Sequence, residues 1–174
     1  MFTIPILVLA VIASFSTKKN GIYKQERIGQ NGIVFTIFKI RSMLLTDATN
    51  YITIKNDTRI TKFGSFIRKY HLDELPQIYN VFLGTMSIVG PRPDVKGYAD
   101  VLQGEDKIIL SIKPGITGPA TLHFKNEEAI LAEQKDPQKY NDEVLWKKKI
   151  ELNKEYIKNW SLKNDLKYIL KTLF

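Results

Sequence analysis

Two carboxylates stand side by side in the stretch KYHLDELPQIYN, at Asp73 and Glu74. Arg68 and Lys69 precede this carboxylate pair, leucines flank it, and Pro76 follows. Adjacent carboxylates without a histidine or cysteine cluster favour a hard, oxygen-preferring ion such as Mg²⁺ over zinc. A carboxylate can also attack phosphorus as a nucleophile and form an acyl-phosphate. The residue types therefore suggest chemistry on phosphoryl groups.

Several basic residues could serve such a site. Lys39 and Arg41 are two residues apart, so in a strand they leave from the same face. Arg92 lies between Pro91 and Pro93, which restrict the backbone and hold its guanidinium in a defined place, as phosphate binding requires. Surface decoration, or a loop arginine that pairs with a nearby acid, would explain these residues as well. Further candidates are Asp57, Arg59, Arg68 and His71.

The elements around the carboxylate pair follow from local pattern. Asn31-Gly32 between two β-prone runs predicts a hairpin, because both residues tolerate positive φ. Its second strand is expected over residues 33–40. Ile60, Phe63 and Ile67 have helical spacing and predict a helix before the pair.

Pro76 is expected in the first turn of a second helix, where its missing N–H costs nothing. Asp73 and Glu74 would then lie at or just before a helix N-terminus, which favours negative charge by about 0.3–1 kcal/mol. This placement would keep Asp73 ionised and exposed. Simple capping of the helix is the alternative interpretation.

The first seventeen residues, MFTIPILVLAVIASFST, carry no charged side chain and are followed by Lys18-Lys19. As a helix they would be about 25 Å long, shorter than the roughly 30 Å hydrocarbon core of a membrane. A secretory signal peptide would require positive charge before the apolar run, and this sequence has none there. We expect residues 1–17 to be embedded in a membrane without spanning it. A buried N-terminal helix is the alternative.

The C-terminal third predicts helices in which many lysines alternate with tryptophan, tyrosine and leucine. This pattern is typical of a basic amphipathic surface on anionic lipid, and also of solvated helix faces. The whole chain has 174 residues, no cysteine and a formal net charge of +8. Its length fits one domain, disulfides and thiolate metal sites are excluded, and the charge favours an anionic partner.

Three stretches resemble the bacterial sugar transferase family, the monotopic phosphoglycosyl transferases. They are YKQERIGQNGIVFTIFKIRSM, DTRITKFGSFIRKYHLDELPQIYNVFLGTMSIVGPRPD and KPGITG, and the resemblance runs from about Lys18 to Gly118. It implies transfer of a sugar 1-phosphate from a UDP-sugar to polyprenol phosphate, expected to be undecaprenyl phosphate, with release of UMP and a need for Mg²⁺. It also implies the cytoplasmic face of the bacterial inner membrane, and the first membrane step of exopolysaccharide, O-antigen, capsule or glycoprotein synthesis.

The resemblance also suggests roles for the carboxylate pair. Asp73 would be the nucleophile that forms a covalent phosphosugar intermediate, and Glu74 with Asp73 would hold Mg²⁺. The expected partners are the UDP-sugar, polyprenol phosphate and membrane lipid, and not nucleic acid. Formation of a homodimer is left open.

The basic residues match family positions in the same way. Arg68 and Arg92 correspond to positions associated with phosphate and uridine-diphosphate binding. Lys39 and Arg41 match the family's Lys-Phe-Arg-Ser/Thr-Met motif, with Ile40 in place of Phe. All four are therefore expected to bind substrate.

Two departures from the family pattern bear on the expectations. The family's re-entrant membrane helix is broken near its middle, and only its second half, with Pro5, is present, so the segment is expected to be truncated. Gly118-Pro119-Ala120-Thr121 replaces the Gly-Leu-Trp-Gln of many members, which leaves the accepted sugar undecided.

We therefore expect an α+β fold, a β-hairpin packed among helices, that is membrane-associated through a partial N-terminal re-entrant helix. Residues 1–17 would be the hydrophobic segment, and residues 18–174 a catalytic domain with basic amphipathic C-terminal helices. One alternative is an inactive member that acts as a membrane scaffold. The other, which rests on charge alone, is a nucleic-acid-binding protein.

Overall fold

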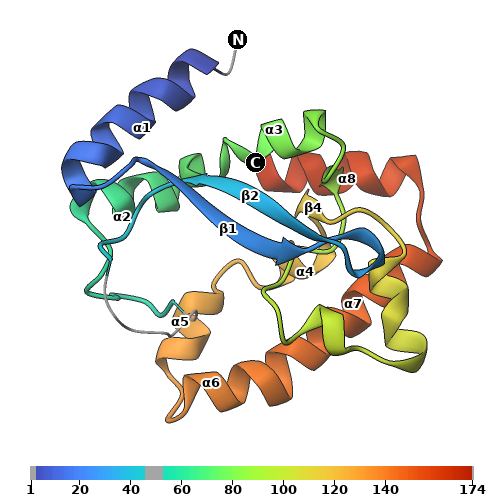
Figure 1. Ribbon diagram of the computed structural model, residues 1–174. Coiled ribbons are helices and arrows are strands. Elements are labelled where there is room, and N and C mark those ends of the chain that lie inside the picture. Colours follow the sequence, from blue (N-terminus) through green and yellow to red (C-terminus); the bar gives the residue numbers. More distant parts are fainter. Residues whose placement is uncertain (1–2, 46–52, 174) are drawn as a thin grey trace.

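A computed structural model describes residues 3–45 and 53–173 and shows a mixed α+β fold, as expected (Figure 1). Helices and strands alternate irregularly, and the strands form two small sheets. The elements are α1 (Thr3–Thr17), β1 (Ile22–Ile28), β2 (Val34–Ile40), α2 (Lys62–Lys69), α3 (Gln77–Phe82), β3 (Ser87–Val89), β4 (Gly115–Thr117), α4 (Pro119–His123), α5 (Glu127–Ala132), α6 (Pro137–Tyr140), α7 (Trp146–Lys158) and α8 (Leu162–Leu173).

The predicted hairpin is confirmed. Strands β1 and β2 pair antiparallel, from Ile22 opposite Ile40 to Ile28 opposite Val34. Asn31 (φ 58°) and Gly32 (φ 75°) adopt the left-handed conformation in the connecting 3₁₀ turn. The positive φ values that made this dipeptide a turn signal are therefore the ones that it uses.

Helices α1 and α2 pack on the hairpin and form the core beside the carboxylate pair. Ala10 and Ala13 of α1 face Ile40 and Ile67, and the Ile67 side chain is fully buried. Burying such a side chain stabilises the fold by about 2 kcal/mol. Gly64 lets α2 approach the chain after β2, because a Cβ there would lie 1.9 Å from the Ser42 carbonyl oxygen.

The described part of α1 therefore has two faces. Its inner face belongs to the core, whereas Ile4, Leu7 and Phe15 point outward and are 74%, 59% and 81% exposed. Among the described residues, no helix has both the length and the apolar character needed to cross a membrane. Residues 1 and 2 of the predicted hydrophobic segment lie outside the described residues.

A second sheet, which the sequence analysis did not predict, consists of β3 and β4. These strands pair parallel, with Ser87 opposite Gly115 and Val89 opposite Thr117. The backbones meet so closely that a Cβ on Gly115 would lie 2.2 Å from the Gly90 nitrogen. The Pro91-Arg92-Pro93 turn follows directly after β3, so this sheet carries Arg92 toward the hairpin.

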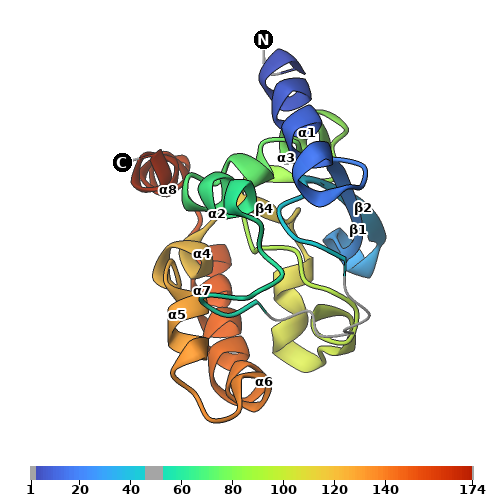
Figure 2. The same ribbon diagram turned by 90° about the vertical axis from the view of Figure 1, so that its left-hand side faces the viewer.

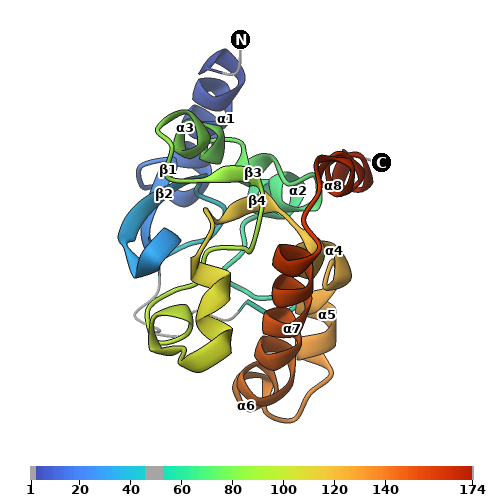
Figure 3. The ribbon, with the colours of Figure 1, turned by 90° about the vertical axis from the view of Figure 1, so that its right-hand side faces the viewer.

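The C-terminal third folds into helices, as predicted. Helices α4, α5 and α7 form a group on the side of the molecule away from α1 and α3, as Figures 2 and 3 both show. Helix α8 turns back from this group and contacts α4 and the β3–β4 sheet. It ends near α2, on the same side of the molecule as α1 and α3 (Figures 1–3).

Candidate active site

Glu74 is the centre of a three-residue ion cluster. The Lys39 Nζ lies 3.1 Å from Glu74 Oε1, and Arg92 Nη1 lies 3.2 Å from Oε2. Arg92 Nη2 donates a second hydrogen bond to Oε1, so the guanidinium grips the carboxylate with two nitrogens. The three side chains come from β2, from the 3₁₀ turn Leu72–Glu74 and from the Pro91–Pro93 turn. The structure therefore brings together four predicted site residues, counting Asp73 beside Glu74.

The backbone between α2 and α3 explains how the carboxylate pair reaches this place. Helix α2 ends at Lys69, and His71 takes the left-handed conformation (φ 53°), which reverses the chain. Leu72 to Glu74 then form one 3₁₀ turn, and α3 begins just after Pro76. The predicted position just before a helix is confirmed. The His71 side chain is exposed, and the residue marks the point at which the backbone changes direction.

The prediction that Asp73 is exposed is wrong. Its side chain is buried, with 7% of the residue surface exposed, because the 3₁₀ turn packs against β2. Within the described residues the Asp73 carboxylate forms no hydrogen bond or ion pair. Burial, and then the neighbouring charge of Glu74, raise the pKa of Asp73, although Lys39, Arg68 and Arg92 oppose the shift.

Glu74 differs from Asp73 in its electrostatics. Burial by itself would raise the pKa of Glu74, but the charges and hydrogen bonds of Arg92 and Lys39 hold it well below its usual range. Burial lowers the pKa of Lys39, and Glu74 works against that shift. The two neighbouring carboxyl groups therefore have pKa values moved in opposite directions, a pattern typical of acid, base or nucleophile sites.

The remaining predicted residues lie farther out. Arg68 pairs with Glu128 of α5, yet its charge still acts on Asp73. Arg41 follows the end of β2, stacks on the Tyr23 ring at 5.2 Å and donates to the Asn20 carbonyl. Arg41 therefore contacts Tyr23 and Asn20, whereas Lys39 contacts Glu74, and Arg41 is not part of the ion cluster around Glu74.

Two other predicted candidates pair with each other. Asp57 and Arg59 form an ion pair with a shortest separation of 2.6 Å. The chain between β2 and this pair lies partly outside the described residues.

The structure adds residues that the sequence analysis missed. Arg27 of β1 and Asp94 lie beside Arg92, and burial raises the pKa of Asp94 to about 6. Lys149 of α7 pairs with Glu127 of α5 at 2.7 Å, and both charges act on Asp94. Strand parity could have revealed Arg27, because its pairing places it on the same face of the hairpin as Lys39.

The metal-binding capacity of the site is small. In residues 3–45 and 53–173, no three acidic or histidine side chains come together in a way that could hold a metal ion. The ligands predicted at this site are the Asp73 and Glu74 carboxylates. This donor set fits Mg²⁺, which usually takes one or two carboxylates and completes its shell with water and substrate phosphates.

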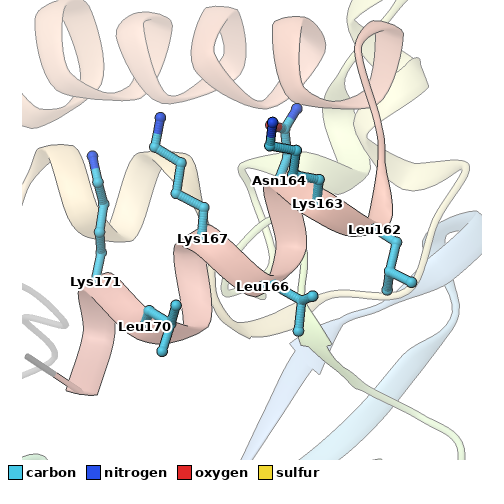
Figure 4. A pocket seen from close by; sticks show the side chains of 7 residues that line it. All are labelled: Leu162, Lys163, Asn164, Leu166, Lys167, Leu170 and Lys171. Carbon is cyan, nitrogen blue, oxygen red and sulfur yellow. The ribbon is translucent and has the colours of Figure 1, made fainter.

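Helix α8 presents a second notable surface. Leu162, Leu166 and Leu170 project from one side of the helix, and Lys163 and Lys167 project from the other (Figure 4). The three leucines are 67%, 54% and 56% exposed. All the residues that line this shallow depression belong to α8, so it is a feature of the outer surface and is separate from the carboxylate site.

Comparison with known proteins gives a consistent assignment. A UDP-glucose:undecaprenyl-phosphate glucose-1-phosphate transferase of Xanthomonas campestris pv. campestris is 40% identical over 95% of this chain and 33% of its own length. The galactosyl transferase CpsE of Streptococcus agalactiae is 36% identical over 98% of this chain and 39% of its own. The uncharacterized sugar transferase EpsL of Bacillus subtilis is 35% identical over 87% and 67%. This chain thus spans about a third of the length of most curated relatives described here. The model of the family described as "Bacterial sugar transferase" matches residues 1–174, and the chain belongs to that family.

Proposed function

We propose that this protein transfers a sugar 1-phosphate from a UDP-sugar to polyprenol phosphate, with release of UMP. The observation that carries the proposal is the Asp73 carboxylate beside the Lys39–Glu74–Arg92 cluster, in a chain of the bacterial sugar transferase family. Relatives named for transfer to undecaprenyl phosphate support this acceptor. Their names include both glucose and galactose, so they leave the sugar open.

The proposed reaction has two displacements at one phosphorus atom. An Asp73 carboxylate oxygen attacks the β-phosphorus of the UDP-sugar, and the bond from that phosphorus to the bridging oxygen breaks. UMP leaves with the electron pair, and the sugar phosphate remains on Asp73 as an acyl-phosphate. A phosphate oxygen of polyprenol phosphate then attacks the same phosphorus. The bond to Asp73 breaks, which restores the carboxylate and gives the polyprenyl diphosphate sugar.

The surrounding charges support this chemistry. An anionic nucleophile approaches an anionic diphosphate only if positive charge offsets the repulsion, and Arg92, Lys39 and Arg68 all act on Asp73. The Arg92 side chain is 42% exposed while it holds Glu74, so it lies at the surface, where a phosphate could reach it. Mg²⁺ at Asp73 and Glu74 would supply further charge to the diphosphate. Arg41, which stacks on Tyr23, would act at the edge of the site.

Membrane association is part of the proposal, and one side of the molecule supports it. Helices α1, α3 and α8 lie along the same side in all three ribbon views (Figures 1–3). Each carries exposed apolar side chains, including Phe15 (81%), Phe82 (78%) and Leu162 (67%). We call the outward sides of these three helices the apolar face. Exposed apolar area on this scale, with lysines beside it, suits the cytoplasmic surface of the bacterial inner membrane.

The decisive experiment measures UMP release from a panel of UDP-sugars, with polyprenol phosphate and Mg²⁺ in nanodiscs. We expect release with at least one sugar, dependence on the acceptor, and loss of release on chelation. Asp73→Asn should reduce turnover at least about a thousandfold, because an amide cannot form the intermediate. Near-wild-type turnover in that variant would reject Asp73 as nucleophile.

The same experiment tests the scaffold alternative, which the low exposure of Asp73 favours. A scaffold would bind UDP-sugars without releasing UMP. Acid titration gives a further check on the proposed nucleophile. Because the pKa of Asp73 is raised, turnover should fall on acidification at a higher pH than the ordinary aspartate value of about 3.9 would give.

A further inference from the structure

The Pro91-Arg92-Pro93 turn is held through its carbonyl groups. Proline has no N–H, so backbone donors must come from elsewhere. The Pro91 carbonyl accepts a hydrogen bond of 2.8 Å from the Gly115 N–H of β4. The Asp94 carbonyl accepts one of 2.9 Å from the Ile28 N–H of β1. Both sheets of the molecule therefore contribute one backbone anchor to this turn.

A third anchor comes from a side chain. Arg27 of β1 donates from Nη1 to the Pro93 carbonyl at 3.2 Å and from Nη2 to Gln25 Oε1 at 2.7 Å. The Pro93 carbonyl directly follows Arg92, the residue whose guanidinium grips Glu74. The Arg27 bond thus fixes the Pro93–Asp94 peptide, which begins one residue after Arg92.

The buried position of Arg27 lowers the stability of the fold, which indicates that this arginine has a specific function. Its Nε is buried and has no hydrogen-bond partner in the described part of the chain. An unsatisfied buried donor costs about 1–3 kcal/mol. Burial and then the nearby Arg92 charge lower the pKa of Arg27, while Asp94, Tyr23 and Glu74 oppose the shift. The fold therefore places the Arg27 guanidinium close to that of Arg92, although the two positive charges repel each other.

We propose that Arg27 is a positioning residue for the donor substrate: through the Pro93 carbonyl it fixes the turn that aims Arg92 at Glu74 and the diphosphate. This role rests on the proposed function. Arg27 touches neither Asp73 nor Glu74 by any hydrogen bond in the described residues, so its effect passes through the turn. The proposal predicts that the contribution of Arg27 depends on the presence of the Arg92 guanidinium.

The first test needs no turnover. Arg27→Met keeps the side-chain length but removes the charge and the donors. In this variant we expect faster hydrogen exchange at the Ile28 and Gly115 amides, which bond to the turn, by about tenfold or more. The amides of β1–β2 pairs remote from the turn, such as Tyr23 opposite Lys39 toward the far end of the hairpin, serve as internal controls and should change little. Unchanged exchange at Ile28 and Gly115 would overturn the proposal.

The second test is a double-mutant cycle with Arg92→Ala. Arg27→Met alone should raise the KM for the UDP-sugar about tenfold, the loss expected for one charge-assisted hydrogen bond. It should leave the KM for polyprenol phosphate unchanged. Added to Arg92→Ala, it should change the donor KM less than twofold. Arg27→Lys keeps the charge and one donor and should restore part of the loss.

The outcomes separate the proposal from the proposed function. A full tenfold effect of Arg27→Met in the Arg92→Ala background would show independent action and overturn the positioning role. An equal rise in both KM values, with no rescue by lysine, would show a general structural defect and overturn it too. If the wild-type protein releases no UMP from any UDP-sugar, the proposed function fails. The exchange experiment still decides whether Arg27 holds the turn.

Discussion

The carboxylate site and the outer surface of α8 use basic residues in opposite ways. In the site, Lys39 and Arg92 share one carboxylate, and the side chains of Lys39 and Glu74 are only 18% and 12% exposed. On α8, Lys163, Lys167 and Lys171 are exposed, and none pairs with a carboxylate in the part of the chain that the structure describes. Matched charges in a low dielectric are strongly interdependent, whereas exposed charges act almost singly.

This difference predicts large effects of single substitutions in the site and small, additive effects on α8. Removing one member of the partly buried Lys39–Glu74–Arg92 cluster leaves its partners charged and unpaired. Removing one exposed lysine leaves the others nearly unaffected.

The largest effect on stability is expected for Glu74→Gln. This change leaves Lys39 and Arg92 without their common carboxylate and should lower the free energy of unfolding by about 2–4 kcal/mol. Urea unfolding at pH 7 measures it. Asp73→Asn is the matched control, the same change one residue away. It should not destabilise the protein, because burial disfavours the charged form of Asp73. Equal stability of the two variants would contradict the comparison.

The pH dependence of the Glu74 contribution gives a second check on the same variants. The folded-state pKa of Glu74 is lower than its unfolded value of about 4.3. The stability that Glu74 provides is thus fully present above pH 4.3 and is lost as the pH falls toward the folded-state pKa. The gap between wild type and Glu74→Gln should narrow on acidification below about pH 4.3.

Asp94→Asn is expected to raise the free energy of unfolding, the opposite of the effect expected for Glu74→Gln. Burial raises the pKa of Asp94 to about 6, above the unfolded value of about 3.9. Above pH 6 the buried charge costs stability, and that cost disappears as the pH falls from about 6 toward 4. Asp94→Asn should therefore gain about 2–3 kcal/mol at pH 7.5 and almost nothing at pH 3, where the carboxyl group is protonated in both states, as measured by urea unfolding. The exposed Asp100→Asn serves as control. A gain that is equal at both pH values would contradict the assignment.

Local signals predicted the elements that carry the site. Asn31-Gly32 specified the hairpin, because its two residues tolerate the φ values that the turn needs. Pro76 correctly placed the carboxylate pair just before a helix. Lys39 could be placed near the end of the second strand because its residue type and position were both visible locally, and its role in the site stays a prediction. These inferences depend on a few neighbouring residues, and tertiary packing did not override them.

Long-range contacts could not be predicted in the same way. Strands β3 and β4 have three residues each and are separated by more than twenty residues, so no local sequence pattern predicts their pairing. Asp73 was expected to be exposed because a helix start is usually at the surface. Its burial results from packing of the 3₁₀ turn on β2. The contact between Glu128 and Arg68 joins residues sixty positions apart and also depends on the complete fold.

On the apolar face, single substitutions are expected to have moderate effects. Leu166→Gln removes a leucine that is 54% exposed and should weaken insertion of α8 into a lipid surface by about 1–2 kcal/mol. Trp160 precedes α8 and is 60% exposed, so quenching of its fluorescence by brominated lipid reports insertion. Trp146→Phe removes the second tryptophan of the chain. Val101→Gln, an equally exposed apolar residue outside α1, α3 and α8, should not reduce quenching. Quenching that is unaffected by Leu166→Gln would place α8 away from lipid.

The smallest single effects should belong to the α8 lysines. Each change to glutamine at Lys163, Lys167 or Lys171 should weaken binding to vesicles that contain phosphatidylglycerol by about 1 kcal/mol or less. The losses should add, because exposed charges about one helical turn apart interact only weakly at physiological salt. They should vanish on uncharged phosphatidylcholine vesicles and shrink as salt rises. Lys148→Gln is the control, since Lys148 is exposed but already paired with Glu151 at 2.9 Å. If one α8 lysine alone accounted for most of the binding, it would behave like a residue of the carboxylate site, and the contrast between the two regions would fail.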